Sequence, residues 1–497
     1  MSKNLLGVDF GTTALKACLF NEKGELLASE SAQYTLITKG DFIEFPAEEF
    51  YKVFIETISK ITAKFKVDAL AVDTQGETMI VLDKDGNPLM NAIIWLDNRA
   101  FKQAKEMEEF FGLEKIYNLT GQAEVPAGYP APKIKWLKDN QPEIFNKADK
   151  FLLLEDYILY RLTGKFNSSR SLYSSSLLMN IHTGEYIPEV LEYLGINESQ
   201  LPTLKESGEV VGEYMGITVA TSALDQIAGA TGAGVVKEGI MSETTGTALA
   251  VCALTEKFPP YYNDLKVSVY YVRKGVYCLL MWAPTAGAVL EWFKKNFCEN
   301  LSLKEIDDLA SAIPEGSEGL IALPHLCGTV MPENQSNAKG VFFGVELKHT
   351  RAHFARAIME SVAYMIREFV EYMGISLDEI RSMGGGAKSK LWCSIKSNLL
   401  NKNIVTLKEN ETACLGSSIF AGVSIGAYNS SIEATEKIVA LNKVYKPENS
   451  AYEKIYADYK IKEKKLMEIF KWLKLHLLGL AKLIRLLKLL KESVKAH

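Results

Sequence analysis

The sequence predicts an α/β protein built from two successive units, each containing a mixed β-sheet. Apolar runs typical of strands alternate with segments whose apolar residues recur every three or four positions, as in helices that cover a sheet. A short pattern also recurs, because residues 11–19 and 246–254 each place a glycine and a hydroxyl residue at the head of an apolar strand. We therefore divide the chain near residue 236, into residues 1–236, residues 237–468 and a terminal segment, 469–497.

The first unit is predicted to open with a β-hairpin whose two strands are joined by Gly11-Thr12-Thr13. Apolar spacing across residues 46–65 predicts a helix between the hairpin and the next buried strand. The expected strands of this unit cover residues 5–10, 14–20, 25–31, 67–74, 79–82 and 92–96.

The second unit repeats this arrangement. A strand, a Gly-Thr turn and a second strand are expected within residues 240–254, followed by a hairpin of residues 267–272 and 276–282. A long amphipathic helix over residues 352–373 ends at Gly374, which suits a helix C-terminus because it lacks a Cβ atom.

Composition excludes several classes of protein. The 497 residues are 47% hydrophobic and 24% charged, which is enough apolar material for a core without disulfide or metal support. The formal net charge of −5 argues against a nucleic-acid binder, which would show a basic surface. The seven scattered cysteines form no CxxC pair, and the first residues lack the apolar core of a signal peptide, so a cytoplasmic protein is expected. No P-loop and no zinc-type ligand spacing is present in the sequence.

The turn after the first strand is a candidate phosphate site. Glycine–hydroxyl turns present backbone N–H groups to anions, and both Gly11-Thr12-Thr13 and Thr245-Gly246-Thr247 have this composition. Asp9 ends a strand expected to be buried, where a carboxylate needs a partner or a cation. It either caps its own turn or helps to hold hydrated Mg²⁺. Lys16 either approaches the same phosphates or lies on the exposed edge of the hairpin.

Two further features are candidates for chemistry. Asp225 lies where an apolar strand gives way to a helix, so it is either an N-terminal cap or a general base kept ionised by the helix dipole. The run Gly384-Gly385-Gly386-Ala387 precedes a helix over residues 390–400, and it suits close backbone contact with a flat or anionic ligand.

Together these residues resemble the FGGY carbohydrate kinase family, within the superfamily of actin-like ATPases. The resemblance covers residues 4–460, and two long patterns carry it. The first is Gly128-x-Pro130-x-x-Lys133-Ile134-x-Trp136-Leu137-x-Asp139-Asn140. The second is Gly340-x-Phe342-x-Gly344-Val345, followed after seven residues by His353-Phe354-x-x-Ala357-Ile358-Met359-Glu360.

The resemblance implies two ribonuclease-H-like domains around a central cleft, with ATP and Mg²⁺ as cofactors and a small sugar or polyol as substrate. It implies that Asp9 and Asp225 serve the Mg²⁺ site and that Asp225 is also the catalytic base, beside the substrate-contacting Gln226. The remaining implied nucleotide contacts are Gly11, Thr12, Thr13 and Lys16, then Thr245, Gly246 and Thr247, and for adenosine Gly385, Gly386, Ala387 and Asn398.

The implied substrate segment contains Gln75, Gly76 and Glu77, with Tyr129 able to close over the sugar or to serve the core. Glycerol kinases carry arginine where this chain has Gly76, and xylulokinases typically carry Met-His where it has Gly76-Glu77, so neither pattern matches in full. We expect a ketopentose such as xylulose as the acceptor. A glycerol or tetritol kinase, and a sugar-sensing homologue without turnover, are the alternatives, and a homodimer is one assembly that the sequence allows. Arg99 is expected either to line the pocket or to form a structural ion pair.

The terminal segment lies outside the resemblance. Between Lys471 and His497 there are seven basic residues and one acid, so this segment carries +6 and residues 1–470 carry −11 of the total of −5. Five of its basic residues, Lys471, Lys474, Lys482, Arg485 and Lys488, fall on one side of a leucine-rich helix. We favour packing of this helix on the body or on a partner over a membrane surface or an origin outside the native gene.

Overall fold

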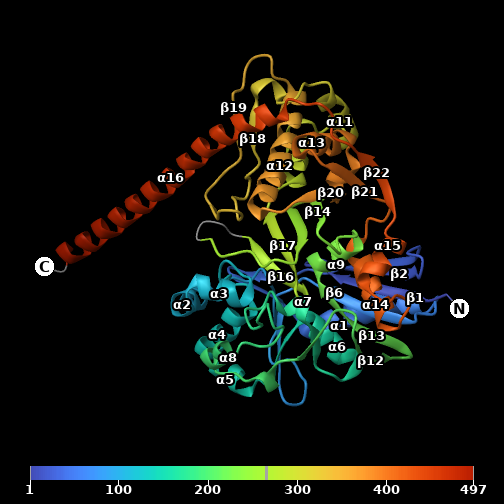
Figure 1. Cartoon of the computed structure of the whole chain (residues 1–497). Helices are drawn as coiled ribbons and strands as arrows, with labels where there is room; N and C mark the ends of the chain where they lie inside the picture. The colour runs from blue at the N-terminus through green and yellow to red at the C-terminus, as the bar shows by residue number, and fades with distance from the viewer. Residues whose placement is uncertain (1, 263–266, 496–497) are drawn as a thin grey trace.

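The structure is a computed structural model that describes residues 2–262 and 267–495. Within the last helix it describes side chains as far as Leu473, together with His476. Two large sheets dominate the fold, and Figure 1 shows the first in the lower part of the molecule and the second in the upper part.

The first sheet has six strands in the order β12-β13-β6-β1-β2-β3. β1, β2 and β3 are antiparallel, whereas β6 and β13 run parallel to β1. Side chains alternate along β1, so that Leu6 and Val8 pack beneath helix α1 while Leu5 faces the opposite core. The bounds are β1 (Asn4–Phe10), β2 (Ala14–Asn21), β3 (Leu26–Gln33), α1 (Ala47–Thr62), β6 (Ala69–Thr74), β12 (Val210–Tyr214) and β13 (Ile217–Leu224).

The first unit also contains a smaller sheet and a group of helices. Two strands of the smaller sheet precede α1, and its other strands and the helices lie between β6 and β12. The smaller sheet has the order β4-β5-β8-β7-β9, and β8 is shorter than the strand predicted at 92–96. Its strands are β4 (Ile37–Lys39), β5 (Phe42–Phe45), β7 (Met79–Leu82), β8 (Ala92–Ile93) and β9 (Lys150–Leu153). The helices are α2 (Phe101–Phe111), α3 (Leu113–Thr120), α4 (Pro130–Asn140), α5 (Pro142–Lys147), α6 (Leu154–Thr163), α7 (Arg170–Tyr173) and α8 (Pro188–Leu194), with short strands β10 (Asn167–Ser169) and β11 (Thr203–Lys205).

The second large sheet repeats the first, as the sequence predicts. Its order is β16-β17-β15-β14-β20-β21-β22, with β14, β15 and β17 antiparallel and β20 and β21 parallel to β14. The strands are β14 (Gly239–Thr245), β15 (Leu249–Thr255), β16 (Ser268–Arg273), β17 (Val276–Ala283), β20 (Leu377–Met383), β21 (Asn403–Leu407) and β22 (Leu441–Tyr445). The elements around it are α10 (Gly287–Phe297), α11 (Leu303–Ser311), β18 (Ile321–Leu323), β19 (Val341–Phe343), α12 (Arg351–Met373), α13 (Lys390–Leu400) and α15 (Ser431–Ile438).

Two helices cross between the sheets, α9 (Asp225–Gly232) and α14 (Thr412–Ser424), as Figure 1 shows. A Cβ atom on Gly416 would lie 1.9 Å from the Ala228 carbonyl oxygen, and one on Gly232 would lie 1.9 Å from the Thr412 carbonyl oxygen. A Cβ atom on Gly7 of β1 would lie 1.8 Å from the Cys414 carbonyl oxygen. Only glycine permits these approaches. Because α14 follows residue 236 yet packs on β1, β6 and β13, the division at that residue stays a prediction.

The last helix, α16 (Tyr452–Lys495), begins earlier than the terminal segment and starts on the body. Tyr452, Tyr456 and Tyr459 are buried, and Lys471 forms an ion pair of 2.8 Å with Glu333. Beyond this point the helix extends away from the body in Figure 1. The predicted basic and leucine-rich faces between Lys474 and Lys495 lie outside the described side chains. None of the described helices combines the length and apolar composition needed to cross a membrane.

The helix crossing is testable with two glycine variants. We expect Gly416→Ala to lower the free energy of unfolding by roughly 3 kcal/mol, because its methyl group collides with backbone that must move. The matched control is Gly229→Ala in α9, where the nearest atom to an added Cβ is Thr412 Oγ1 at 3.9 Å. That change should be neutral or stabilising by up to ~1 kcal/mol. Equal melting temperatures of the two variants in thermal denaturation would contradict the crossing.

Candidate functional site

Carboxylates gather where three parallel strands of the first sheet end. Asp9 of β1 lies opposite Asp73 of β6 in the register, and Asp225 begins α9 directly after β13. Because β1, β6 and β13 are parallel, their carboxyl ends share one edge of the sheet, where α/β proteins bind ligands. Asp73 is not among the predicted site residues. The signal that singles out Asp9, an acid at the end of an apolar strand, applies equally to it.

The Asp9 and Asp73 carboxyl groups perturb each other. Asp73 is fully buried, and its Oδ2 accepts a hydrogen bond of 2.5 Å from Ser417 Oγ of α14. Its Oδ1 accepts no hydrogen bond from any described residue. Burial, followed by the charge of Asp9, raises the pKa of Asp73 well above its usual range. Burial also raises the pKa of Asp9 to about 6.

Asp225 corrects one expectation from the sequence. It is the first helical residue of α9 rather than a cap, and its Oδ1 accepts a hydrogen bond of 2.6 Å from its neighbour, Gln226 N. Burial, then the charges of Asp9 and Glu77, raises the pKa of Asp225 to about 8. The helix dipole was expected to keep this carboxylate ionised, but burial and two like charges outweigh it.

This group of carboxyls fits a hydrated divalent cation. Mg²⁺ prefers oxygen ligands and typically takes one or two carboxylates together with substrate phosphates and water. Asp73 Oδ1 is buried without a hydrogen-bond partner in the described part of the chain, and the carboxylates of Asp9, Asp73 and Asp225 repel one another when ionised. A cation bound at this edge of the sheet would relieve both unfavourable terms. Within residues 2–262 and 267–495, no three His, Cys, Asp or Glu side chains converge on a complete protein site. The assignment of Mg²⁺ to Asp9 and Asp225 remains a prediction.

Two aromatic side chains hydrogen-bond to the first glycine–hydroxyl turn. Trp95 Nε1 donates a hydrogen bond of 2.9 Å to Thr12 Oγ1, and the Tyr34 hydroxyl donates to the Gly11 carbonyl oxygen. Thr13 remains exposed. Lys16 forms an ion pair of 2.6 Å with Glu411, just before α14, so its ammonium group already has a partner within the protein.

The second turn, Thr245-Gly246-Thr247, packs against the glycine run. The N–H groups of Ala286 and Gly287 donate to the carbonyl oxygens of Thr247 and Gly246 at 2.9 and 2.8 Å. A Cβ atom on Gly384 would lie 2.8 Å from the Thr245 carbonyl oxygen, so these two turns touch through backbone. Gly385 is exposed, Gly386 is buried and Ala387 is half-buried. Asn398 lies on α13, where its Oδ1 accepts a hydrogen bond of 2.9 Å from Glu448 N.

The predicted substrate segment follows β6 directly. Gln75 N donates to the Phe10 carbonyl oxygen at 3.1 Å, and Gly76 has a φ of +78°, which favours glycine. The buried ammonium group of Lys133 donates to the Glu77 carbonyl oxygen at 2.8 Å and to that of Ile94 at 3.0 Å. Burial raises the pKa of Glu77 to about 7. Lys133, part of the first family pattern, therefore anchors this segment.

Tyr129 and Arg99 have protein partners. The Tyr129 hydroxyl donates to Gln122 Oε1 at 3.1 Å and lies 3.1 Å from the hydroxyl of Tyr270 on β16, so it links the two units. Arg99 forms ion pairs of 2.7 Å with both Asp97 and Glu44. Arg99 was expected either to line the pocket or to form a structural ion pair, and the structure contains the ion pair.

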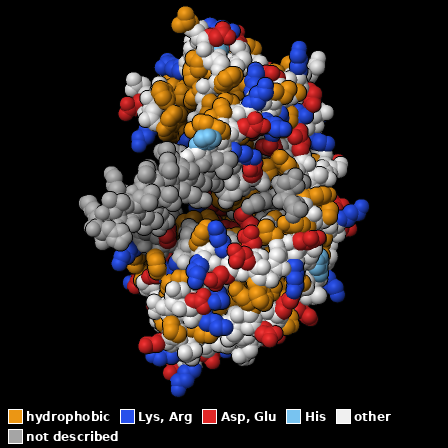
Figure 2. Space-filling model, turned by 90° about the vertical axis from the view of Figure 1, so that its left-hand side faces the viewer, with side chains coloured by type: hydrophobic (Ala, Val, Ile, Leu, Met, Phe, Trp, Pro, Cys, Tyr) orange, Lys and Arg blue, Asp and Glu red, His pale blue; other side chains and the backbone are white. Residues whose placement is uncertain are grey.

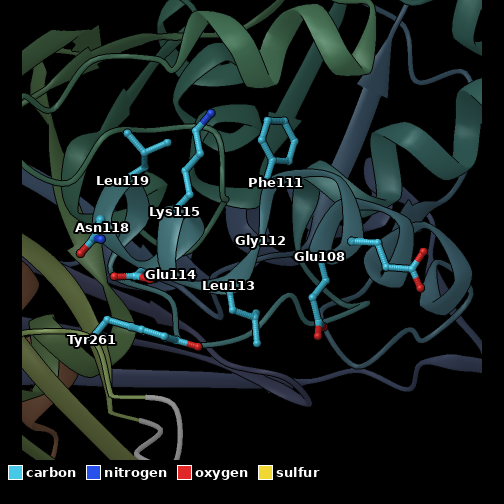
Figure 3. Close-up of a pocket in the computed structure, with 10 residues that line it drawn as sticks. Glu108, Phe111, Gly112, Leu113, Glu114, Lys115, Asn118, Leu119 and Tyr261 are labelled. Atoms are coloured by element: carbon cyan, nitrogen blue, oxygen red, sulfur yellow. The ribbon is translucent and has the colours of Figure 1, made fainter.

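One surface cavity is lined by none of these residues. It has a volume of about 850 Å³ and lies between α2, α3 and Tyr261, as Figure 3 shows. None of its lining residues is a predicted site residue. On the face in Figure 2, basic and acidic side chains are interspersed with hydrophobic ones rather than gathered into a continuous basic area.

Both halves of the chain match a known protein family. Residues 4–235 match the family model for the N-terminal domain of the FGGY family of carbohydrate kinases, and residues 244–425 match its C-terminal domain. The chain is 30% identical to the xylulose kinase of Bacillus subtilis over 88% of this chain and 91% of the relative. It is also 30% identical to the glycerol kinase of Thermococcus gammatolerans, over 94% of this chain and 98% of the relative. The structure of ligand-bound xylulose kinase from Lactobacillus acidophilus superimposes with a TM-score of 0.87 at 26% identity, covering 94% of this chain and 98% of the other.

The perturbed carboxyl at Asp225 is testable through thermal stability. Because its pKa is raised in the folded state, Asp225 stabilises the fold at low pH, and this contribution is lost as pH rises toward 8. An asparagine cannot ionise. We therefore expect the melting temperature of Asp225→Asn, relative to the unaltered protein, to rise between pH 5 and pH 8.5.

Differential scanning fluorimetry without nucleotide or Mg²⁺ measures this difference. The control is Asp85→Asn, at an exposed turn position, whose offset from the unaltered protein should stay constant with pH. A constant offset for Asp225→Asn as well would show that the carboxyl is not perturbed.

Proposed function

The chain belongs to the FGGY family of carbohydrate kinases, and from this premise we propose that it transfers the γ-phosphoryl group of ATP to a hydroxyl group of a small sugar or polyol. The acceptor we propose is a ketopentose such as xylulose. The observation that carries the proposal is the position of Asp225, which begins α9 beside the strand ends that carry Asp9 and the Gln75–Glu77 segment.

In this proposal Asp225 is the general base. Its carboxylate accepts the proton of the substrate hydroxyl, whose oxygen forms a bond to the γ-phosphorus as the bond to the bridging β–γ oxygen breaks and ADP leaves. Such a transfer depends on positioning and charge neutralisation. Asp9 and Asp225 would hold Mg²⁺, which supplies positive charge to the phosphates. That charge would also favour the ionised form of Asp225, which burial disfavours.

We assign the nucleotide to the three turns. Backbone N–H groups of Gly11, Thr12, Thr13 and Thr247 would receive the phosphates. The Gly246 N–H donates to the Ala248 carbonyl oxygen at 3.0 Å, so Gly246 would have to give up that bond to contribute. The Thr12 hydroxyl accepts a hydrogen bond from Trp95 and keeps its own proton for a phosphate oxygen. Lys16 is paired with Glu411 and would have to leave that partner to contact a phosphate. Gly385, Gly386 and Ala387 would receive adenosine, with Asn398 near it.

We assign the substrate to the Gln75–Glu77 segment together with Gln226 and Tyr129. Glu77, held by Lys133, and Gln75 offer hydrogen-bond acceptors suited to hydroxyl groups. The resemblance to xylulose kinases in both sequence and structure favours a ketopentose. Glycerol is the second candidate, because a glycerol kinase is similar to the same extent.

The remaining assignments concern location and assembly. We propose that the protein acts in the cytoplasm, since all seven cysteines are free and six of them are buried. We also propose that α16 stays on the body as far as Lys471, where its ion pair with Glu333 supports packing. A homodimer stays a prediction.

A substrate panel tests the proposed function. The full chain is incubated with ATP, Mg²⁺ and, in turn, xylulose, ribulose, glycerol, erythritol or gluconate, and ADP release is followed by a coupled assay. We expect xylulose to give the highest kcat/KM. Preference for glycerol would select the second candidate. If no acceptor in the panel leads to ADP release, the protein is not a kinase of small sugars or polyols.

A variant tests the role of Asp225. We expect Asp225→Ala to lower kcat by ~10²-fold or more, as for loss of a general base, while ADP still binds. The matched control is Asp85→Ala, an exposed position outside the site, which should leave kcat unchanged. Turnover of Asp225→Ala within about tenfold of the unaltered enzyme would refute the assignment.

A further inference from the structure

A fully buried ion pair lies beneath the second phosphate turn. Lys396 of α13 and Glu243 of β14 have side chains without solvent exposure, and Lys396 Nζ lies 2.5 Å from Glu243 Oε1. Neither residue belongs to the predicted site. An isolated buried charge is strongly unfavourable, so a pair of this kind persists only when its remaining donors and acceptors are also satisfied.

The pair forms a closed hydrogen-bonded ring with Thr245. Lys396 Nζ donates to Thr245 Oγ1 at 2.9 Å, and the Thr245 hydroxyl in turn donates to Glu243 Oε2 at 2.7 Å. Ser382 Oγ of β20 donates to Glu243 Oε1. The single hydroxyl proton of Thr245 is therefore used inside the protein. Thr245 can serve a nucleotide only through its backbone, while Gly246 and Thr247 follow it toward the surface.

The ring also reaches the glycine run. A Cβ atom on Gly386 would lie 2.6 Å from Thr245 Cβ and 3.3 Å from Lys396 Nζ, so Gly386 packs directly on both. The ring thus ties together β14, β20 and α13. These three elements lead into or out of the phosphate turn and the glycine run, which the proposed function assigns to opposite ends of the nucleotide.

We infer that Lys396 and Glu243 are positioning residues, which hold the phosphate turn and the glycine run at the separation that ADP and ATP require. This inference rests on the proposed function. The pair touches no nucleotide itself. The pair instead fixes the side chain of Thr245 by hydrogen bonds to its hydroxyl group, and thereby fixes the backbone of the turn that Thr245 begins.

A purely structural role makes a different prediction. Replacing both members of a buried ion pair by apolar residues often leaves a protein folded and stable, whereas removing one member leaves an unpaired charge. If the pair only stabilised the second unit, the double variant Glu243→Leu/Lys396→Met would fold and bind ADP normally. If the pair positions the turns, that variant would fold but bind ADP weakly.

The experiment is titration calorimetry of the full chain with ADP and Mg²⁺. We expect the double variant to bind ADP about tenfold more weakly and to show a raised KM for ATP with an unchanged KM for the sugar. The matched control is Arg356→Met/Glu360→Leu, which removes the buried pair of 2.9 Å within α12 and should leave ADP affinity unchanged. Folding of each variant is checked by its melting temperature.

A second pair of variants decides the question if either double variant does not fold. Thr245→Val keeps the shape of the side chain but breaks the ring, and we expect about fivefold weaker ADP binding, in line with loss of one buried hydrogen bond. Thr245→Ser keeps the hydroxyl and should restore affinity. ADP affinity within about twofold of the unaltered protein in both the double variant and Thr245→Val would overturn the inference alone. No ADP binding by the unaltered protein would overturn the proposed function and the inference with it.

Discussion

The close crossing of α9 and α14 is the contact on which the rest of the molecule depends. Glycines at positions 232 and 416 let the two helices meet through backbone, and Gly7 lets α14 lie against β1. The helix that begins with Asp225 is thereby fixed between the sheets. The same helix α14 supplies Ser417 to Asp73 and is preceded by Glu411, the partner of Lys16. Packing and the candidate site are therefore set by one geometric constraint.

The candidate site holds charge at a cost in stability. Asp73 is buried, Asp9 and Asp225 are half-buried close to it, and desolvation raises the pKa of each. Such an arrangement is unfavourable for folding alone, and perturbed carboxyls of this kind gather at functional sites. The contrast with Lys396 and Glu243 is informative, because there the two buried charges are paired with each other and both also bond to Thr245. The three aspartates are arranged to receive a cation, whereas Lys396 and Glu243 fix the positions of the turns around the nucleotide.

Local patterns were sufficient to predict several main elements of the fold. The hairpin around residues 11–13, the buried strand that ends near residue 74 and the long helix that ends at Gly374 all follow from the spacing of apolar residues and from glycine. The same local chemistry identified Asp9, Asp225 and the glycine–hydroxyl turns as candidates. It passed over Asp73, although an acid at the end of an apolar strand was the very signal used for Asp9.

By itself the sequence determined the α/β class, the repeated two-unit architecture and the family, because these depend on periodicity and on motifs that are contiguous along the chain. Only the tertiary structure decided which side chains meet. The ion pair of Lys16 with Glu411, the hydrogen bond of Trp95 to Thr12 and the ring of Lys396, Glu243 and Thr245 mostly join residues far apart in sequence. It also decided the upward shift of the Asp225 pKa, since a pKa depends on burial and on neighbouring charges that arrive only when distant strands pack together.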